Sequence, residues 1–116
     1  MTPYRLKVSR TFPRPLLPND NPLTEEGVAL DRQPFHDTSL SANGRQSCAS
    51  CHQAAAASTD PGRTSSVGAE GTAGTHDTMP LANLAWQTSF FWDGRAASLR
   101  EQVLMPVTNP VEMHER

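Results

Sequence analysis

The sequence is poor in the residues from which a protein of its length builds a large core. Only 36% of its 116 residues are hydrophobic and 6% are aromatic, whereas ten are proline and seven are glycine. Such a chain buries a thin core and contains much loop. No apolar run approaches the roughly 18–20 residues of a membrane-spanning helix, so we expect no membrane span. The net charge of −2 gives no electrostatic reason to expect nucleic acid as a partner.

Cysteine is also scarce, and the only two cysteines are Cys48 and Cys51. His52 follows the second directly, which completes Cys-x-x-Cys-His, the attachment signature of a c-type haem. Two thiols one helical turn apart can each add to a vinyl group on the same porphyrin edge. The histidine is then placed to be the proximal ligand of the iron. Ser47 is a suitable N-cap for the short helix that would carry the motif.

Three other uses of the two cysteines compete with haem attachment. A structural zinc site needs about four ligands, and His36, His76 and His114 do not stand at a zinc-binding spacing. A thioredoxin-like redox pair would follow a strand, and no strand is predicted before Cys48. A disulfide is disfavoured by the short loop between the two thiols. Haem attachment is the favoured interpretation, with redox or zinc use as the remaining alternatives.

Proline and capping residues predict the first half of the fold. Five prolines in residues 1–23 favour an extended arm over a helix. Thr24, followed by two glutamates, predicts a helix that runs to about Gln33 and ends at Pro34. Phe35 and Leu40 are expected in the core. The domain that follows the arm is predicted to cover residues 24–116.

The second half is predicted to contain long loops and short helices. The four alanines at 54–57 indicate either a short helix or a close approach of the backbone to a porphyrin, and residues 58–75 indicate a long loop. Three helices are predicted here. One begins at Thr78, a second runs over Ser98–Met105 and is stopped by Pro106, and a third begins at Val111. No segment is a convincing strand. The predicted fold class is therefore all-α, a small c-type cytochrome domain of short helices and long loops around one covalent haem.

Several short segments of the sequence occur in an order that is typical of one family. Together they resemble the N-terminal domain of the bacterial di-haem cytochrome c peroxidases, the family that includes the MauG-type enzymes. The resemblance runs from about residue 20 to the end and is carried by Asn21–Thr24, Phe35–Asp37, Leu40–Ser41, Ser47–His52, Phe91–Ala96, Glu101–Gln102 and Asn109–Met113.

The resemblance implies a role for each matching residue. The haem held by His52 would be the peroxidatic one, where peroxide binds. Glu112 matches the distal acid of the family, and Gln102 matches a glutamine that hydrogen-bonds near the open iron position. Trp92 matches the tryptophan between the two haems. Asp77 falls at a position where the family helps to bind a calcium ion between domains, so it is a possible calcium ligand.

The implied function is that of a haem-dependent peroxidase, as the N-terminal half of a di-haem enzyme. It would reduce hydrogen peroxide with electrons from a C-terminal haem domain, a small cytochrome or a cupredoxin. Ala69 stands where many members have a histidine that caps the iron, so we expect an open iron site. The sequence has no second haem motif, so we expect it to be truncated. Haem attachment implies the periplasm, although Met1–Arg10 lacks the apolar region of a secretory signal.

A simpler function competes with the peroxidase. Met79 follows the haem motif at a distance where small cytochromes place an axial methionine, so the chain could be a monohaem electron carrier with His52 and Met79 as ligands. The segments Phe91–Arg95 and Asn109–Met113 have no role in such carriers. The peroxidase is therefore the favoured hypothesis.

Overall fold

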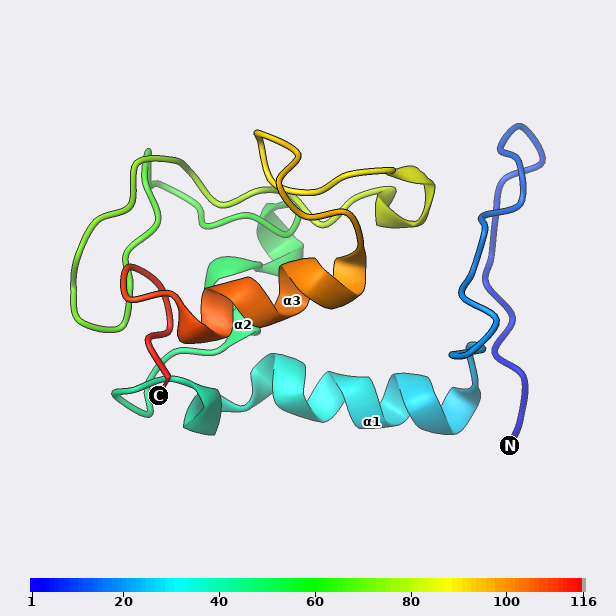
Figure 1. Cartoon of the computed structure of the whole chain (residues 1–116), viewed down its shortest axis with the longest axis horizontal. Helices are drawn as coiled ribbons and strands as arrows, with labels where there is room; N and C mark the ends of the chain where they lie inside the picture. The colour runs from blue at the N-terminus through cyan, green and yellow to red at the C-terminus, as the bar shows by residue number, and fades with distance from the viewer. Residues whose placement is uncertain (116) are drawn as a thin grey trace.

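The computed structural model describes residues 1–115 and contains a few short helices joined by long loops (Figure 1). Among these residues the backbone pairs only through isolated bridges, so the prediction of a helical domain without strands is confirmed. No helix in this part of the chain is long and apolar enough to cross a membrane. In chain order the elements are α1 (Glu25–His36), η1 (Thr38–Leu40), α2 (Cys48–Cys51), η2 (Ala54–Ala56), η3 (Leu84–Trp86) and α3 (Leu99–Thr108).

Residues 1–23 contain no helix, as the prolines predict. Figure 1 shows this arm at the end of the molecule where α1 begins. The backbone N–H of Thr2 donates to both carboxylate oxygens of Glu26, at 3.0 and 2.9 Å. Further along the arm, the carbonyl of Pro13 accepts a hydrogen bond of 2.9 Å from the indole Nε1 of Trp86. The arm is therefore attached to the body both at α1 and at η3.

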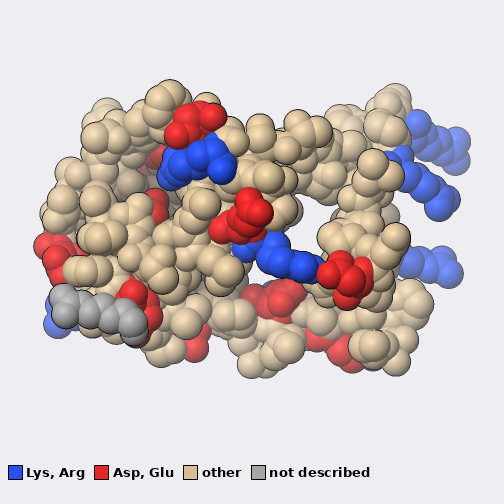
Figure 2. Space-filling view, in the orientation of Figure 1, with Lys and Arg blue, Asp and Glu red and all other residues tan. Residues whose placement is uncertain are grey.

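Positive charge gathers on the arm. Arg5, Lys7, Arg10 and Arg14 are four of the ten basic residues in the sequence, and the first acidic residue is Asp20. Figure 2 shows basic side chains projecting from this end of the molecule, whereas acidic side chains are spread over the body. Asp20 itself pairs with Arg100 of α3 at 3.2 Å, which adds a third attachment between the arm and the body.

Helix α1 begins as the sequence predicts. The side chain of Thr24 accepts a hydrogen bond of 3.0 Å from the N–H of Gly27, which is the expected N-cap. The predicted end was wrong, because the helix continues through Pro34 to His36. A proline this close to a helix end removes a single backbone hydrogen bond, to the carbonyl of Leu30. Residues 29–34 are exposed, so water can take the place of that bond.

Helix α3 also begins where predicted and ends later. The hydroxyl of Ser98 accepts from the N–H of Glu101 at 3.2 Å, and the Glu101 carboxylate accepts from the N–H of Ala97 at 3.0 Å. The helix does not stop at Pro106 but runs to Thr108.

The chain after α3 folds back over the last turn of that helix. The N–H of Met113 donates to the carbonyl of Pro106 at 3.1 Å, and the N–H of Glu115 donates to the carbonyl of Val107 at 2.8 Å. These bonds satisfy carbonyls that a helix end leaves unpaired, which explains how α3 extends past its proline. The helix predicted to begin at Val111 was wrong, since the described residues there form turns; the last residue of that prediction, Arg116, lies outside them.

The helix predicted to begin at Thr78 does not form. Residues 77–82 have no regular structure, and Asn83 adopts a left-handed conformation with φ of 54°. Only then does a single 3-10 turn, η3, begin. A left-handed residue interrupts any helix that would cross it, so the apolar residues from Leu81 to Ala85 cannot form one continuous stripe.

The hydrophobic core is small. Its buried apolar residues are Phe90, Ala96 and Met113, and no large side chain among the described residues is fully buried. Phe35 and Leu40, which were predicted to lie in the core, are only half-buried. The polypeptide alone therefore leaves much apolar surface uncovered.

Candidate functional site

The haem motif forms helix α2, which consists of the four residues from Cys48 to Cys51. Ser47 is its N-cap, as predicted: its N–H donates to the hydroxyl of Ser50 at 3.1 Å, and that hydroxyl donates to the carbonyl of Ser47 at 2.6 Å. Helix α1 packs against α2. The two thiols are not joined in a disulfide, and the described residues contain no group of three or more potential metal-binding side chains that would suit zinc.

Burial governs the chemistry of both thiols. It raises the pKa of the Cys48 thiol and that of the Cys51 thiol, and the negative charges of Asp60 and Glu112 raise the latter further. Redox-active cysteines have a lowered pKa, because the thiolate is the reactive form. Neutral, half-buried thiols disfavour the redox alternative and are compatible with thioether bonds to an apolar group.

His52 follows directly after α2 as its C-cap, and its ring is held through the nitrogen Nδ1. Nδ1 lies 3.0 Å from the carbonyl oxygen of Ser58. A carbonyl can only accept, so Nδ1 carries the proton and Nε2 keeps its lone pair for a metal. This is the usual outer partner of a metal-binding histidine. The sequence carries no signal for this contact, because the partner is a backbone atom six residues away.

A tight turn after the haem motif places that carbonyl. The alanines at 54–57 form the single 3-10 turn η2, so of the two alternatives the short helix is the nearer description. Ala57 and Ser58 then adopt left-handed conformations, with φ of 55° and 61°. The turn closes with a hydrogen bond of 3.1 Å from the N–H of Gln53 to the carbonyl of Thr59. It thereby brings the Ser58 carbonyl back to the His52 ring.

Glu112 lies in the segment that folds back over α3. Its side chain is half-buried, and its Oε2 atom is buried with no hydrogen-bond partner in the described part of the chain. Burial raises the pKa of the Glu112 carboxyl, while the Asn109 side chain and the positive charge of Arg95 act in the opposite direction. Glu112 is close enough to the haem motif for its negative charge to raise the pKa of the Cys51 thiol, although 61 positions separate the two residues.

Gln102 and Trp92 lie on other elements. Gln102 is half-buried on α3. Trp92 occupies a turn closed by the bridge between Phe90 and Ala96; its side chain is 69% exposed and stacks on the ring of His76, with centroids 4.8 Å apart. Within residues 1–115 neither side chain forms a hydrogen bond with the haem motif.

The remaining candidate ligands are Asp77 and Met79. Asp77 is exposed, beside the stacked His76. Met79 is half-buried in the irregular segment before η3.

The described residues fit a c-type haem. Two unpaired thiols lie one turn apart, and the imidazole that follows them has its Nε2 free. No large side chain among residues 1–115 is fully buried, so a planar apolar group would supply burial that these residues do not. Oε2 of Glu112 is a buried polar atom with no hydrogen-bond partner among residues 1–115, and such atoms are usually satisfied by a ligand or a water.

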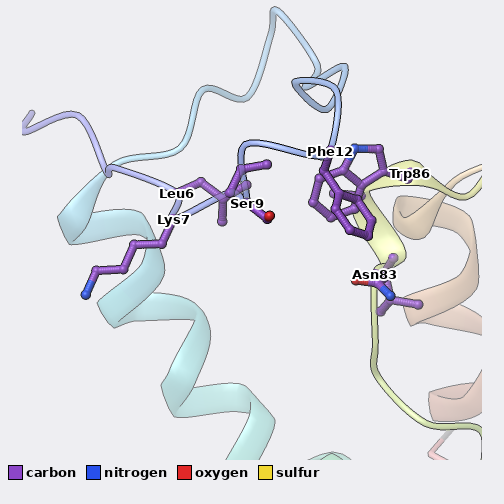
Figure 3. A pocket seen from close by; sticks show the side chains of 9 residues that line it. Leu6, Lys7, Ser9, Phe12, Asn83 and Trp86 are labelled. Carbon is purple, nitrogen blue, oxygen red and sulfur yellow. The ribbon is translucent and has the colours of Figure 1, made fainter.

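One cavity lies elsewhere, between the arm and η3 (Figure 3). It has a volume of about 300 Å³, and the rings of Phe12 and Trp86 pack edge to face on one side of it. None of the predicted site residues lines it.

Comparison with known proteins identifies the family to which these features belong. The model of the family "Di-haem cytochrome c peroxidase" matches residues 25–116. The methylamine utilization protein MauG of Methylorubrum extorquens is 47% identical over 97 residues, which cover 84% of this chain and 27% of that protein. The cytochrome c peroxidase Ccp of Escherichia coli is 38% identical over 104 residues, which cover 90% of this chain and 22% of that protein.

A solved structure shows the same fold. The crystal structure of a MauG-like protein associated with microbial copper homeostasis superposes with a TM-score of 0.89 at 34% sequence identity. The match covers 97% of this chain and 33% of that one. The chain therefore spans between a fifth and a third of the length of these relatives.

Proposed function

Since this chain belongs to the family of di-haem cytochrome c peroxidases, we propose that it is the peroxidatic haem domain of a MauG-type or peroxidase-type oxidoreductase. The observation that carries the proposal is the position of Glu112. Its carboxyl is half-buried, has one oxygen without a partner among residues 1–115, and lies close enough to the haem motif to raise the pKa of the Cys51 thiol. A carboxylate in such a place can take a proton from one peroxide oxygen and return it to the other.

The other residues would have supporting roles. Cys48 and Cys51 would hold the haem covalently, and His52 would bind its iron through Nε2 while Ser58 keeps the ring oriented. Haem supplies the redox-active iron when it is bound. Gln102, on α3, would hydrogen-bond to peroxide beside Glu112.

Electrons would reach this site from outside the domain. The proposed sources are a second haem domain, a small cytochrome or a cupredoxin, with Trp92 on the path. Its large exposed area leaves it accessible to a second domain or protein. The place of action proposed for the domain is the periplasm.

The absorption spectrum of the ferric protein tests this function against the electron carrier. We expect a high-spin ferric spectrum and ready cyanide binding, because Ala69 stands where a capping histidine would be and cannot ligate iron. Met79→Ala should leave that spectrum unchanged, as should Met105→Ala on α3, the matched control. A low-spin spectrum with a methionine–iron band that disappears only in Met79→Ala would establish the carrier and overturn the peroxidase.

A calcium site at Asp77 is a separate proposal. The carboxylate is a hard oxygen ligand and is exposed, but calcium takes about six to eight oxygen ligands. Other ligands would have to come from a second domain, so we expect weak calcium binding to the present chain. In a protein that includes the second domain, Asp77→Ala should lower calcium affinity in calorimetry, whereas Asp31→Ala on α1 should not. An unchanged affinity in Asp77→Ala would show that the residue is not a ligand.

A further inference from the structure

The segment that carries Glu112, residues 111–114, is hydrogen-bonded to a loop distant in sequence, residues 68–70. The N–H of Ala69 donates to the carbonyl of Glu112 at 2.6 Å. On the other side of the segment, the N–H of Ala42 donates to the carbonyl of Met113 at 2.8 Å. The backbone of the proposed acid is thus fixed by two partners that lie outside its own segment.

The loop and this segment touch backbone to backbone. A Cβ atom on Gly68 would overlap the carbonyl oxygen of Val111 and would lie 2.9 Å from that of Glu112. Gly68 is buried, and a side chain at this position would force the two backbones apart. The side-chain amide of Asn43 donates to the carbonyl of Ala69, which is a further hydrogen bond that holds the loop in place.

A side-chain pair closes the same contact. Nδ1 of His114 lies 2.7 Å from Oε1 of Glu70, although 44 residues separate the two. The His114 side chain is 19% exposed and that of Glu70 is 56% exposed. A partly exposed pair of this kind adds little to the free energy of unfolding. Its main contribution is to hold the two backbone segments in a fixed relative position. It joins the loop residue next to Ala69 to a residue two positions from Glu112.

We propose that Glu70 and His114 are positioning residues that clamp residues 68–70 onto the Glu112 segment and so fix the Glu112 carboxyl at the site. The inference rests on the proposed function of that carboxyl. The clamp fixes the backbone that carries a carboxyl whose Oε2 atom has no hydrogen-bond partner among residues 1–115. A displacement of about 1 Å at a reacting group can reduce a rate by roughly 10²-fold.

The conservative variant of His114 distinguishes a clamp from a general loss of structure. His114 has a φ of 52°, a conformation that asparagine tolerates better than alanine. The asparagine amide nitrogen can also take the place of Nδ1 as the donor to Glu70. His114→Asn should therefore retain the clamp, and His114→Ala should lose it.

The test uses the haem-loaded protein and two kinds of measurement. In His114→Ala we expect hydrogen–deuterium exchange of the Ala69 amide to become about tenfold faster, and the second-order reaction with hydrogen peroxide to become about tenfold slower. His114→Asn should restore both. Carbon monoxide binding to the reduced protein should not change, since it needs no proton transfer. Asp20→Asn, which breaks the exposed pair with Arg100, should change none of these quantities.

The outcomes separate the inference from the function on which it rests. A normal peroxide rate in His114→Ala, alongside a slow Glu112→Gln, would overturn the clamp and leave the proposed function intact. A normal rate in Glu112→Gln itself would overturn the proposed function. If His114→Ala does not fold, Glu70→Ala and Glu70→Gln serve in its place. The glutamine keeps an acceptor oxygen and should behave as the unmodified protein, and equal behaviour of the two variants would overturn the clamp.

Discussion

Replacing both Cys48 and Cys51 by alanine is expected to abolish covalent haem attachment completely. The thiols are the only two in the chain, and the four residues of α2 set them one helical turn apart. Each would form one thioether with the same porphyrin edge, so a single replacement leaves one bond and the double replacement leaves none. His52 would still be able to bind the iron, but only as a reversible ligand.

The measurement is extraction of denatured protein with acidified organic solvent after production with periplasmic haem-attachment machinery. The unmodified protein should keep its haem in the aqueous, protein-bound fraction, and the double variant should release it all. Ser47→Ala is the matched control, because it alters the N-cap of α2 but neither thiol. Release of haem from the unmodified protein would contradict the assignment of the motif.

The starts of the helices could be predicted because they depend on neighbouring residues. Thr24, Ser47 and Ser98 each begin a helix as expected, and the hydrogen bonds that define the caps span only three positions. An N-cap is satisfied within its own turn, so the sequence around it contains nearly all the relevant information.

The ends of the helices could not be predicted, because they depend on distant or returning chain. Pro106 was expected to stop α3, but residues 109–115 fold back and bond to its last carbonyls. The segment after Thr78 has a helical apolar pattern, yet Asn83 is left-handed, and η3 is attached to the arm through Trp86 and Pro13. A tertiary contact spanning 73 residues has no signature in a local pattern.

The same distinction holds at the site. The haem-binding residues form a contiguous motif, and their chemistry was readable from the sequence. The partners that hold the site were not: the carbonyl of Ser58 is a backbone atom, and the pairing of Glu70 with His114 spans 44 positions. The sequence distinguished His114 only as a histidine outside any zinc-binding spacing, whereas the structure pairs it with Glu70 beside the Glu112 segment. The left-handed conformations of residues 57 and 58 could not be predicted either, because neither residue is glycine.

The second large effect concerns proton transfer by Glu112. Glu112→Gln keeps the size and the polarity of the side chain but removes the atom that can accept and return a proton. We expect the reaction of the haem-loaded protein with hydrogen peroxide to become roughly 10²–10⁴-fold slower, which is the usual contribution of a positioned acid–base group. Stopped-flow absorbance gives the second-order rate constant. Glu115→Gln, three residues further on and also half-buried, is the matched control and should retain the normal rate.

The pH dependence of the peroxide reaction tests the role of Glu112 independently, because the direction of the change can be predicted. The carboxylate form must receive the first proton, so the rate should fall as the pH falls through the pKa of Glu112. Burial raises that pKa, so the fall should begin at a higher pH than for an ordinary glutamate. Glutamine does not titrate, and Glu112→Gln should therefore lose this acidic limb as well as most of the rate. A variant that reacts slowly but keeps the limb would assign the titration to another group, and a variant that keeps both would remove Glu112 from the chemistry.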